Sequence, residues 1–142
     1  MTFWNDSKGT NPAATLRSLE GLPDGSVHLI LGGRAKGTDF RPMAPLVRGK
    51  VKHLYLIGEA ADEIGAALQG TASQSHSRTL DRAVAEAARN ARAGDAVLLS
   101  PACASFDQFR GFAHRGDEYR RLVQDLVHEL LEEGRDGEQA GI

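Results

Sequence analysis

Three polar segments of this 142-residue sequence carry residue types that bind anions or nucleotides. In the first, residues 5–11, the acid Asp6 and the amine Lys8 stand beside hydroxyls, just before Asn11 and a proline that mark a helix start. A helix start offers unpaired N–H groups, so this segment suits an anion or a ribose. Taken alone, a polar turn capped by Asn11 is the simpler interpretation of the same residues.

The second segment, residues 32–40, is glycine-rich but matches neither G-x-G-x-x-G nor G-x-x-x-x-G-K-[ST]. Lys36 is the residue in it that can offer a point charge to a carboxylate or phosphate. Taken alone, a glycine-rich turn with a solvated lysine is the simpler interpretation.

The third segment, residues 100–117, contains Phe106, Phe109 and Phe112 at a spacing of three. Such a stripe is more often core packing than a platform for a ligand. Ser105 is the group here that can meet a carboxylate, through its hydroxyl and backbone N–H.

Other chemistry has little support. Cys103, the single cysteine, precedes His114 without a visible cause for a lowered thiol pKa, so we expect a buried structural thiol. The five histidines show no i, i+4 pair, so no metal site is predicted on the chain. A formal net charge of −2 argues against a basic nucleic-acid binder, and no apolar run is long enough for a bilayer. We expect a cytoplasmic protein that does not bind membranes and is a monomer.

The elements that must position these segments alternate between strands and helices. Continuous apolar runs at 27–31, 54–57 and 96–99 are typical of strands buried on both faces, and shorter strands are predicted near 2–4 and within 71–77. Helical periodicity begins after Asn11 and recurs around 64–68, over 80–91, where Gly94 is placed to end the helix, and over 119–131.

This alternation predicts an α/β fold with an open, mostly parallel, Rossmann-like sheet flanked by helices. Ligands of such sheets lie beyond the carboxyl ends of the strands, so we expect the three polar segments side by side there. We expect one domain over residues 1–133 and a flexible tail over 134–142.

Taken together, the segments carry specific strings in a fixed order. These are FWNDSKGTN at 3–11, GG-x-x-KG-x-DF at 32–40, LLSPACASFDQF at 98–109 and HRGD at 114–117. Over residues 2–131 the sequence resembles the C-terminal domain of the Mur ligases that add D-glutamate in peptidoglycan synthesis, and the resemblance implies that domain's fold.

The resemblance also implies roles. The full-length enzyme uses ATP, with Mg²⁺, to join D-glutamate to UDP-MurNAc-L-alanine. Residues matching the family's D-glutamate positions are Thr10 and Lys36 for one carboxylate, and Ser105, Phe106, Gly111 and Phe112 for the other. Asp6 matches the acid that meets the ATP ribose, and Lys8 lines the nucleotide cleft.

The sequence departs from the family at Ala35, Gly111 and Ala113, where acidic or amide side chains are usual. It contains no phosphate loop, so we expect a fragment that is inactive alone, with catalytic groups and metal ligands outside it. Two alternatives stay open: the terminal domain of a related Mur or folylpolyglutamate-type ligase, and a stand-alone α/β binding module.

Overall fold

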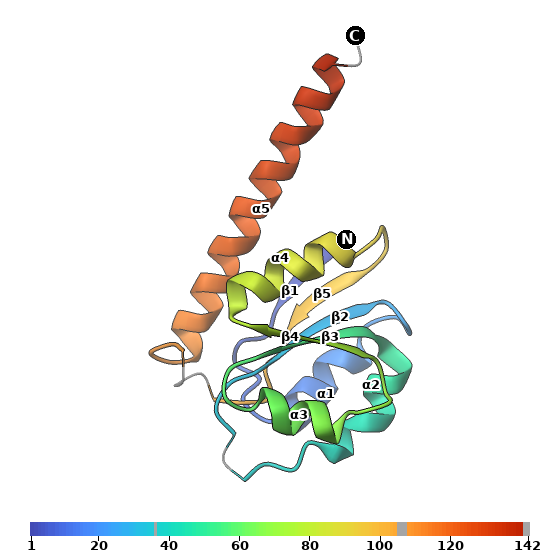
Figure 1. Ribbon diagram of the computed structural model, residues 1–142, viewed down its shortest axis with the longest axis vertical. Helices are drawn as coiled ribbons and strands as arrows, with labels where there is room; N and C mark the ends of the chain where they lie inside the picture. Colours follow the sequence, from blue (N-terminus) through green and yellow to red (C-terminus); the bar gives the residue numbers. More distant parts are fainter. Residues whose placement is uncertain (36, 105–107, 141–142) are drawn as a thin grey trace.

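The computed structural model describes residues 1–35, 37–104 and 108–140, and for 132–140 it gives the backbone helix alone. Within these residues the centre is a five-stranded parallel sheet in the order β1-β5-β2-β3-β4 (Figure 1). The strands are β1 (Thr2–Asn5), β2 (Val27–Gly32), β3 (Val51–Ile57), β4 (Ser73–Arg78) and β5 (Ala96–Leu99). The predicted α/β class with a parallel sheet is confirmed.

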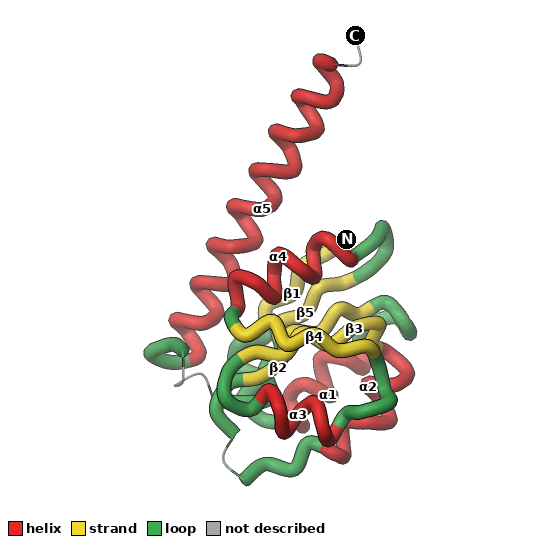
Figure 2. The backbone as a smooth tube through the Cα atoms, in the orientation of Figure 1, coloured by secondary structure: helices red, strands yellow, loops and turns green. Residues whose placement is uncertain are grey.

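Helices cover both faces of the sheet (Figure 2). Helices α1, α2 and α3 lie on one face and α4 and α5 on the other, because the chain steps from β1 to β4 in one direction and then returns to place β5 inside the sheet. The helices are α1 (Pro12–Glu20), the short 3₁₀ turn η1 (Arg41–Met43), α2 (Ala44–Lys50), α3 (Ala61–Ala67), α4 (Leu80–Asn90) and α5 (Phe112–Ala140).

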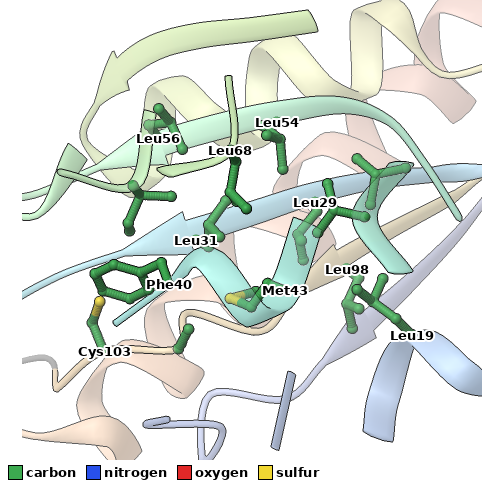
Figure 3. Packing of buried hydrophobic residues seen from close by; sticks show 14 of the residues in the cluster. Leu19, Leu29, Leu31, Phe40, Met43, Leu54, Leu56, Leu68, Leu98 and Cys103 are labelled. Carbon is green, nitrogen blue, oxygen red and sulfur yellow. The ribbon is translucent and has the colours of Figure 1, made fainter. Parts of the chain in front are cut away.

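Burial on both faces explains the continuous apolar strands. In β2, Leu29 and Leu31 pack into the core under α1, α2 and α3, whereas Ile30 points into the core under α4 and α5. Figure 3 shows Leu29 and Leu31 among leucines from neighbouring strands and helices. The prediction that residues 27–31, 54–57 and 96–99 are central buried strands is therefore confirmed.

The helix starts and ends agree in part with the sequence signals. Asn11 caps α1 as predicted, its Oδ1 accepting from the Ala14 amide at 3.0 Å. Gly94 does not end α4, which stops at Asn90; Gly94 instead takes a φ of 88° in the turn before β5. Helix α2 was not predicted, because RPMAPLVRGK has too few apolar residues to show a period.

Helix α5 extends well beyond the sheet (Figure 1). Its first half packs against the core under α4 and α5 through Leu122, Val123 and Leu126. The helix then continues to Ala140 with Leu130 and Leu131 exposed. Its last turns run through the segment predicted to be a flexible tail, and the domain boundary at residue 133 stays a prediction. Among the described residues, no helix combines the length and apolarity needed to cross a membrane.

A buried polar network closes the amino-terminal edge of the sheet. Asp95, which is 5% exposed, accepts hydrogen bonds from Lys52 and the Arg92 amide, and its Oδ2 lies 3.0 Å from Nε2 of His28. Burial raises the pKa of Asp95, but the bonds from Arg92, Lys52 and His28 outweigh it and lower that pKa to about 2. The network therefore favours the charged carboxylate.

This network predicts an acid-sensitive contribution to stability. A carboxyl with a lowered pKa stabilises the fold fully above its ordinary pKa of about 4 and loses that stabilisation as the pH falls towards 2. We expect the free energy of unfolding to fall by about 2 kcal/mol from this source between pH 5 and pH 2. Urea unfolding across that range should show a smaller fall in Asp95→Asn and an unchanged one in Asp62→Asn, a control whose carboxylate is exposed. Equal slopes in the parent and Asp95→Asn would contradict the assignment.

Candidate functional site

The three polar segments meet at the carboxyl edge of the sheet, as predicted. After β1 the chain turns towards α1 on one face, and after the adjacent β5 it turns towards α5 on the other. Loops that leave neighbouring parallel strands towards opposite faces open a crevice, which is where ligands of open α/β sheets bind.

A buried arginine fastens the first segment to the third. The Arg115 guanidinium, 1% exposed, donates to the Ser7 hydroxyl at 3.0 Å, the Ser7 carbonyl at 2.8 Å and the Cys103 carbonyl at 3.0 Å. The Ala102 amide also donates to the carbonyl of Gly9 at 2.8 Å. The sequence did not predict the role of Arg115, because sequence alone does not distinguish a buried arginine from an exposed one.

The Asp6 carboxylate is held in place by hydroxyl groups. Its Oδ2 accepts from Ser18 at 2.6 Å and from Ser100 at 2.7 Å, and the Thr15 hydroxyl, which lies 3.0 Å from that of Ser100, donates to the Ser100 carbonyl at 3.1 Å. These bonds fix the direction of the carboxylate at the end of β1. A carboxylate can accept about four hydrogen bonds, and the bonds from Ser18 and Ser100 both go to Oδ2. Asp6 can therefore still accept from a hydroxyl-bearing ligand.

Two glycines allow close approaches of the second segment, Gly32 to the Ile57 carbonyl of β3 and Gly33 to the third segment. Gly32 and Gly33 have φ of 131° and 142°, and a Cβ on Gly33 would lie 2.2 Å from the carbonyl oxygen of Ala104. Next to them, the Arg34 amide donates to that same carbonyl at 2.8 Å. No residue other than glycine fits this approach without backbone movement.

A hollow of about 410 Å³ lies between the first segment and the start of α5. It brings together three residues predicted for the site, Asp6, Lys8 and Phe112, whose side chain is 46% exposed. The remaining lining residues are Asn5, Ser7, Ala113, Gly116, Asp117 and Arg120. The hollow thus offers a carboxylate, an amine and the first turn of a long helix.

The other predicted site residues fall in two groups. Thr10 is exposed at the end of the first segment, and Gly111 precedes α5 and accepts from the Arg115 amide at 3.1 Å. Lys36, Ser105 and Phe106 lie outside the residues that the structure describes. Their predicted roles therefore stay predictions.

The start of α5 borders the hollow through Phe112 and Ala113. Helix α5 begins at Phe112, so the first N–H groups of the helix have no carbonyl one turn earlier to bond. The Ser7 hydroxyl donates to the Phe112 carbonyl at 2.6 Å, which ties this first turn to the segment after β1. A helix start of this kind favours anionic groups near it, and this one lies beside the hollow.

Cys103 packs as a structural residue. It is 2% exposed, and Figure 3 shows it beside the ring of Phe40 in the core under α1, α2 and α3. The Nδ1 of His114 instead accepts from the Arg110 amide at 3.1 Å. No three of the described His, Cys, Asp or Glu side chains are grouped so as to hold a metal ion.

Comparison with known proteins identifies this arrangement. The family described as "Mur ligase, glutamate ligase domain" matches residues 1–103. The chain belongs to the Mur ligase family. It is 48% identical over 126 residues to the UDP-N-acetylmuramoylalanine–D-glutamate ligase of Syntrophotalea carbinolica, and 50% identical over 128 residues to that of Cupriavidus pinatubonensis.

These matches cover 89% of this chain in both cases but 28% and 25% of the two relatives. A third relative of the same name, from Acidobacterium capsulatum, is 46% identical over 128 residues and is covered to 27%. The chain thus spans about a quarter of the length of these curated Mur ligases.

The close contact at Gly33 yields a stability prediction. Gly33→Ala forces a Cβ against a backbone carbonyl at an unfavourable φ, and we expect it to cost at least about 3 kcal/mol of unfolding free energy. Gly70→Ala is the matched control, since Gly70 has a φ of 83° and a Cβ added there would meet nothing within 4 Å. That control should cost about 1 kcal/mol. Denaturant unfolding of both variants measures the difference, and equal losses would show that the contact is not tight.

Proposed function

We propose that this chain is the C-terminal, amino-acid-presenting domain of an ATP-dependent ligase that adds D-glutamate to UDP-MurNAc-L-alanine. The observation that carries the proposal is the hollow where Asp6, Lys8 and the start of α5 meet. The proposal is supported by the similarity of the chain, at 46–50% identity, to relatives named UDP-N-acetylmuramoylalanine–D-glutamate ligase. We also propose that the enzyme is cytoplasmic and monomeric.

The reaction has two chemical steps. ATP phosphorylates the carboxylate of UDP-MurNAc-L-alanine, and the amine of D-glutamate then attacks the acyl phosphate, so that phosphate leaves and an amide forms. Such transfers depend mainly on positioning and charge stabilisation. Mg²⁺ in the full-length enzyme would neutralise phosphate charge, and its ligands are expected outside this chain.

The contribution of this domain is to hold D-glutamate by its two carboxylates. We assign one to Thr10 and Lys36, and the other to Ser105 and Phe106 together with the Gly111 and Phe112 backbone. A dicarboxylate needs two separated sets of donors, and the unpaired amides at the start of α5 suit one of them. These donors are backbone N–H groups, so they are present whichever side chains stand at positions 111 and 113.

Asp6 and Lys8 would meet ATP at the hollow that they share with Phe112. A carboxylate accepts from a ribose diol, and the two hydroxyls that hold Asp6 supply the fixed orientation that such a contact requires. Lys8 is exposed and lines the hollow, which places its ammonium where a nucleotide or substrate anion can approach. Both groups then act in binding rather than in bond making.

A domain exchange tests the proposal. The matching segment of the Syntrophotalea carbinolica ligase is replaced by this chain, and ADP release is measured with ATP and UDP-MurNAc-L-alanine. We expect release that depends on D-glutamate and not on L-glutamate. A folded chimera that responds to a different amino acid would instead support another Mur or folylpolyglutamate-type ligase.

The chain alone should make no ADP from ATP, UDP-MurNAc-L-alanine and D-glutamate. Its 142 residues contain no phosphate loop to hold the triphosphate. The purified chain and its Lys36→Ala variant are compared in a coupled ADP assay. Substrate-dependent release by the chain above that of the variant would contradict the proposal that catalysis needs further domains.

The binding assignments predict different effects on the KM of each substrate. In the chimera, Lys36→Ala leaves a carboxylate unpaired and should raise the KM for D-glutamate about 30- to 150-fold, the equivalent of about 2–3 kcal/mol. Ser105→Ala removes a neutral donor and should cost about 1 kcal/mol. Asp6→Ala should raise the KM for ATP more than that for D-glutamate.

Ser18→Ala is the control for Asp6, because it removes one hydroxyl partner and keeps the carboxylate. It should change the KM for ATP much less than Asp6→Ala does. If Lys36→Ala raised the KM for ATP and left D-glutamate dependence unchanged, the assignment of the second segment to the amino acid would be wrong.

A further inference from the structure

The turn that leads into α5 has an anchor on the far side of the sheet. The Gln108 side chain donates from Nε2 to the backbone carbonyl of Arg78 at 2.8 Å. Arg78 is the last residue of β4, an edge strand, and is separated from Gln108 by 30 positions. This bond therefore joins the turn before α5 to the edge of the sheet opposite β1.

The accepting carbonyl is held in an unusual conformation. Arg78 has a φ of 72°, in the left-handed region that non-glycine residues rarely adopt. Its carbonyl accepts from the Gly58 amide at 3.2 Å as well as from Gln108. A backbone strain of this kind persists where surrounding bonds determine it, and it is found preferentially beside functional sites.

The turn from 108 to 112 is also held by Phe109, which packs against the core under α4 and α5 and edge-on to the His114 ring, and by bonds at its other end. The Ser7 hydroxyl holds the Phe112 carbonyl, and the Arg110 amide donates to His114 Nδ1 within the start of α5. Gln108 thus supplies the hold on the β4 side, and Ser7 supplies the hold on the β1 side. The two bonds hold the turn from opposite sides.

Gln108 also lies between two hollows. One, of about 550 Å³, is lined by Gly58, His76 and Arg78, and the other, of about 460 Å³, by Thr79, Phe109 and Arg121. The side chain is exposed and takes no part in either apolar core. Replacing Gln108 with alanine therefore removes a surface hydrogen bond without leaving a cavity in the core.

We infer that Gln108 is a positioning residue for amino-acid binding: through the Arg78 carbonyl it fixes the turn that aims the Gly111 and Phe112 backbone at a substrate carboxylate. The inference rests on the proposed function for the identity of that substrate. It assigns Gln108 no contact with D-glutamate and no part in bond making. Its effect passes through the orientation of the turn.

The first test measures the turn in the 142-residue chain itself, without substrate. Backbone ¹⁵N relaxation at residues 109–112 is compared in the parent, Gln108→Ala and Gln74→Ala. Gln74 is a matched control, because its Nε2 makes an equivalent bond to the Gly65 carbonyl at 3.0 Å, away from the turn. We expect larger amplitudes at 109–112 in Gln108→Ala alone. Unchanged relaxation there would overturn the tether.

The second test uses the chimeric ligase. Loss of one neutral hydrogen bond corresponds to about a five-fold change, so Gln108→Ala should raise the KM for D-glutamate about five-fold. The KM for ATP should stay unchanged, and Gln74→Ala should change neither KM. An equal rise in both KM values, or none, would overturn the positioning role even if the turn is loosened.

The two tests separate this inference from the proposed function. A folded chimera without D-glutamate-dependent activity would refute the proposed function and with it the positioning role towards that substrate. The relaxation measurement would still decide whether Gln108 holds the turn. Altered relaxation together with a selective rise in the D-glutamate KM supports both.

Discussion

The insertion of β5 between β1 and β2 determines most of the remaining structure. This strand pairs on both sides, with Phe3 opposite Val97 on one and His28 opposite Val97 on the other. To reach that position the chain must return across the sheet from β4, and the return places α4 and then α5 on the face that α1, α2 and α3 leave open. The loops after β1 and β5 consequently separate, and the crevice between them is the candidate site.

A crevice formed by diverging loops needs internal bonds to keep its shape, and buried polar groups supply them. Arg115 reaches from α5 to both Ser7 and Cys103, and Asp6 collects the hydroxyls of Ser18 and Ser100. Each bond joins segments more than ten residues apart in sequence. Charged groups form stronger hydrogen bonds than neutral ones, which suits positions where a few contacts must order long loops. These residues hold the segments in place beneath the surface, while Lys8 is exposed at the hollow.

The sequence predicted the sheet well because two-sided burial leaves a direct signal. Residues 27–31, 54–57 and 96–99 are nearly uninterrupted apolar runs, and such runs have one common explanation in an alternating α/β pattern. Helix α2 lacked a comparable signal, since its seven residues include a proline and a glycine. The prediction that Gly94 ends a helix was wrong for a related reason. Glycine is suited to a positive φ, and such a φ occurs both at helix ends and in turns before strands.

The candidate site was predictable at the level of segments but not of contacts. The neighbourhood of the three loops follows from the parallel order of the strands, whereas the role of Arg115 depends on burial, which its surrounding letters do not reveal. At Gly111 and Ala113 the sequence departs from the family and suggests a loss that the backbone does not share. The sequence suggests a weakened site there, because side chains usual in the family are missing. Yet the donors proposed at this point are backbone amides at the start of α5, and a helix start provides them whatever side chains precede or follow it. On that proposal, what those positions must preserve is the direction of the turn, which in this chain has bonds to Ser7 on one side and from Gln108 to Arg78 on the other.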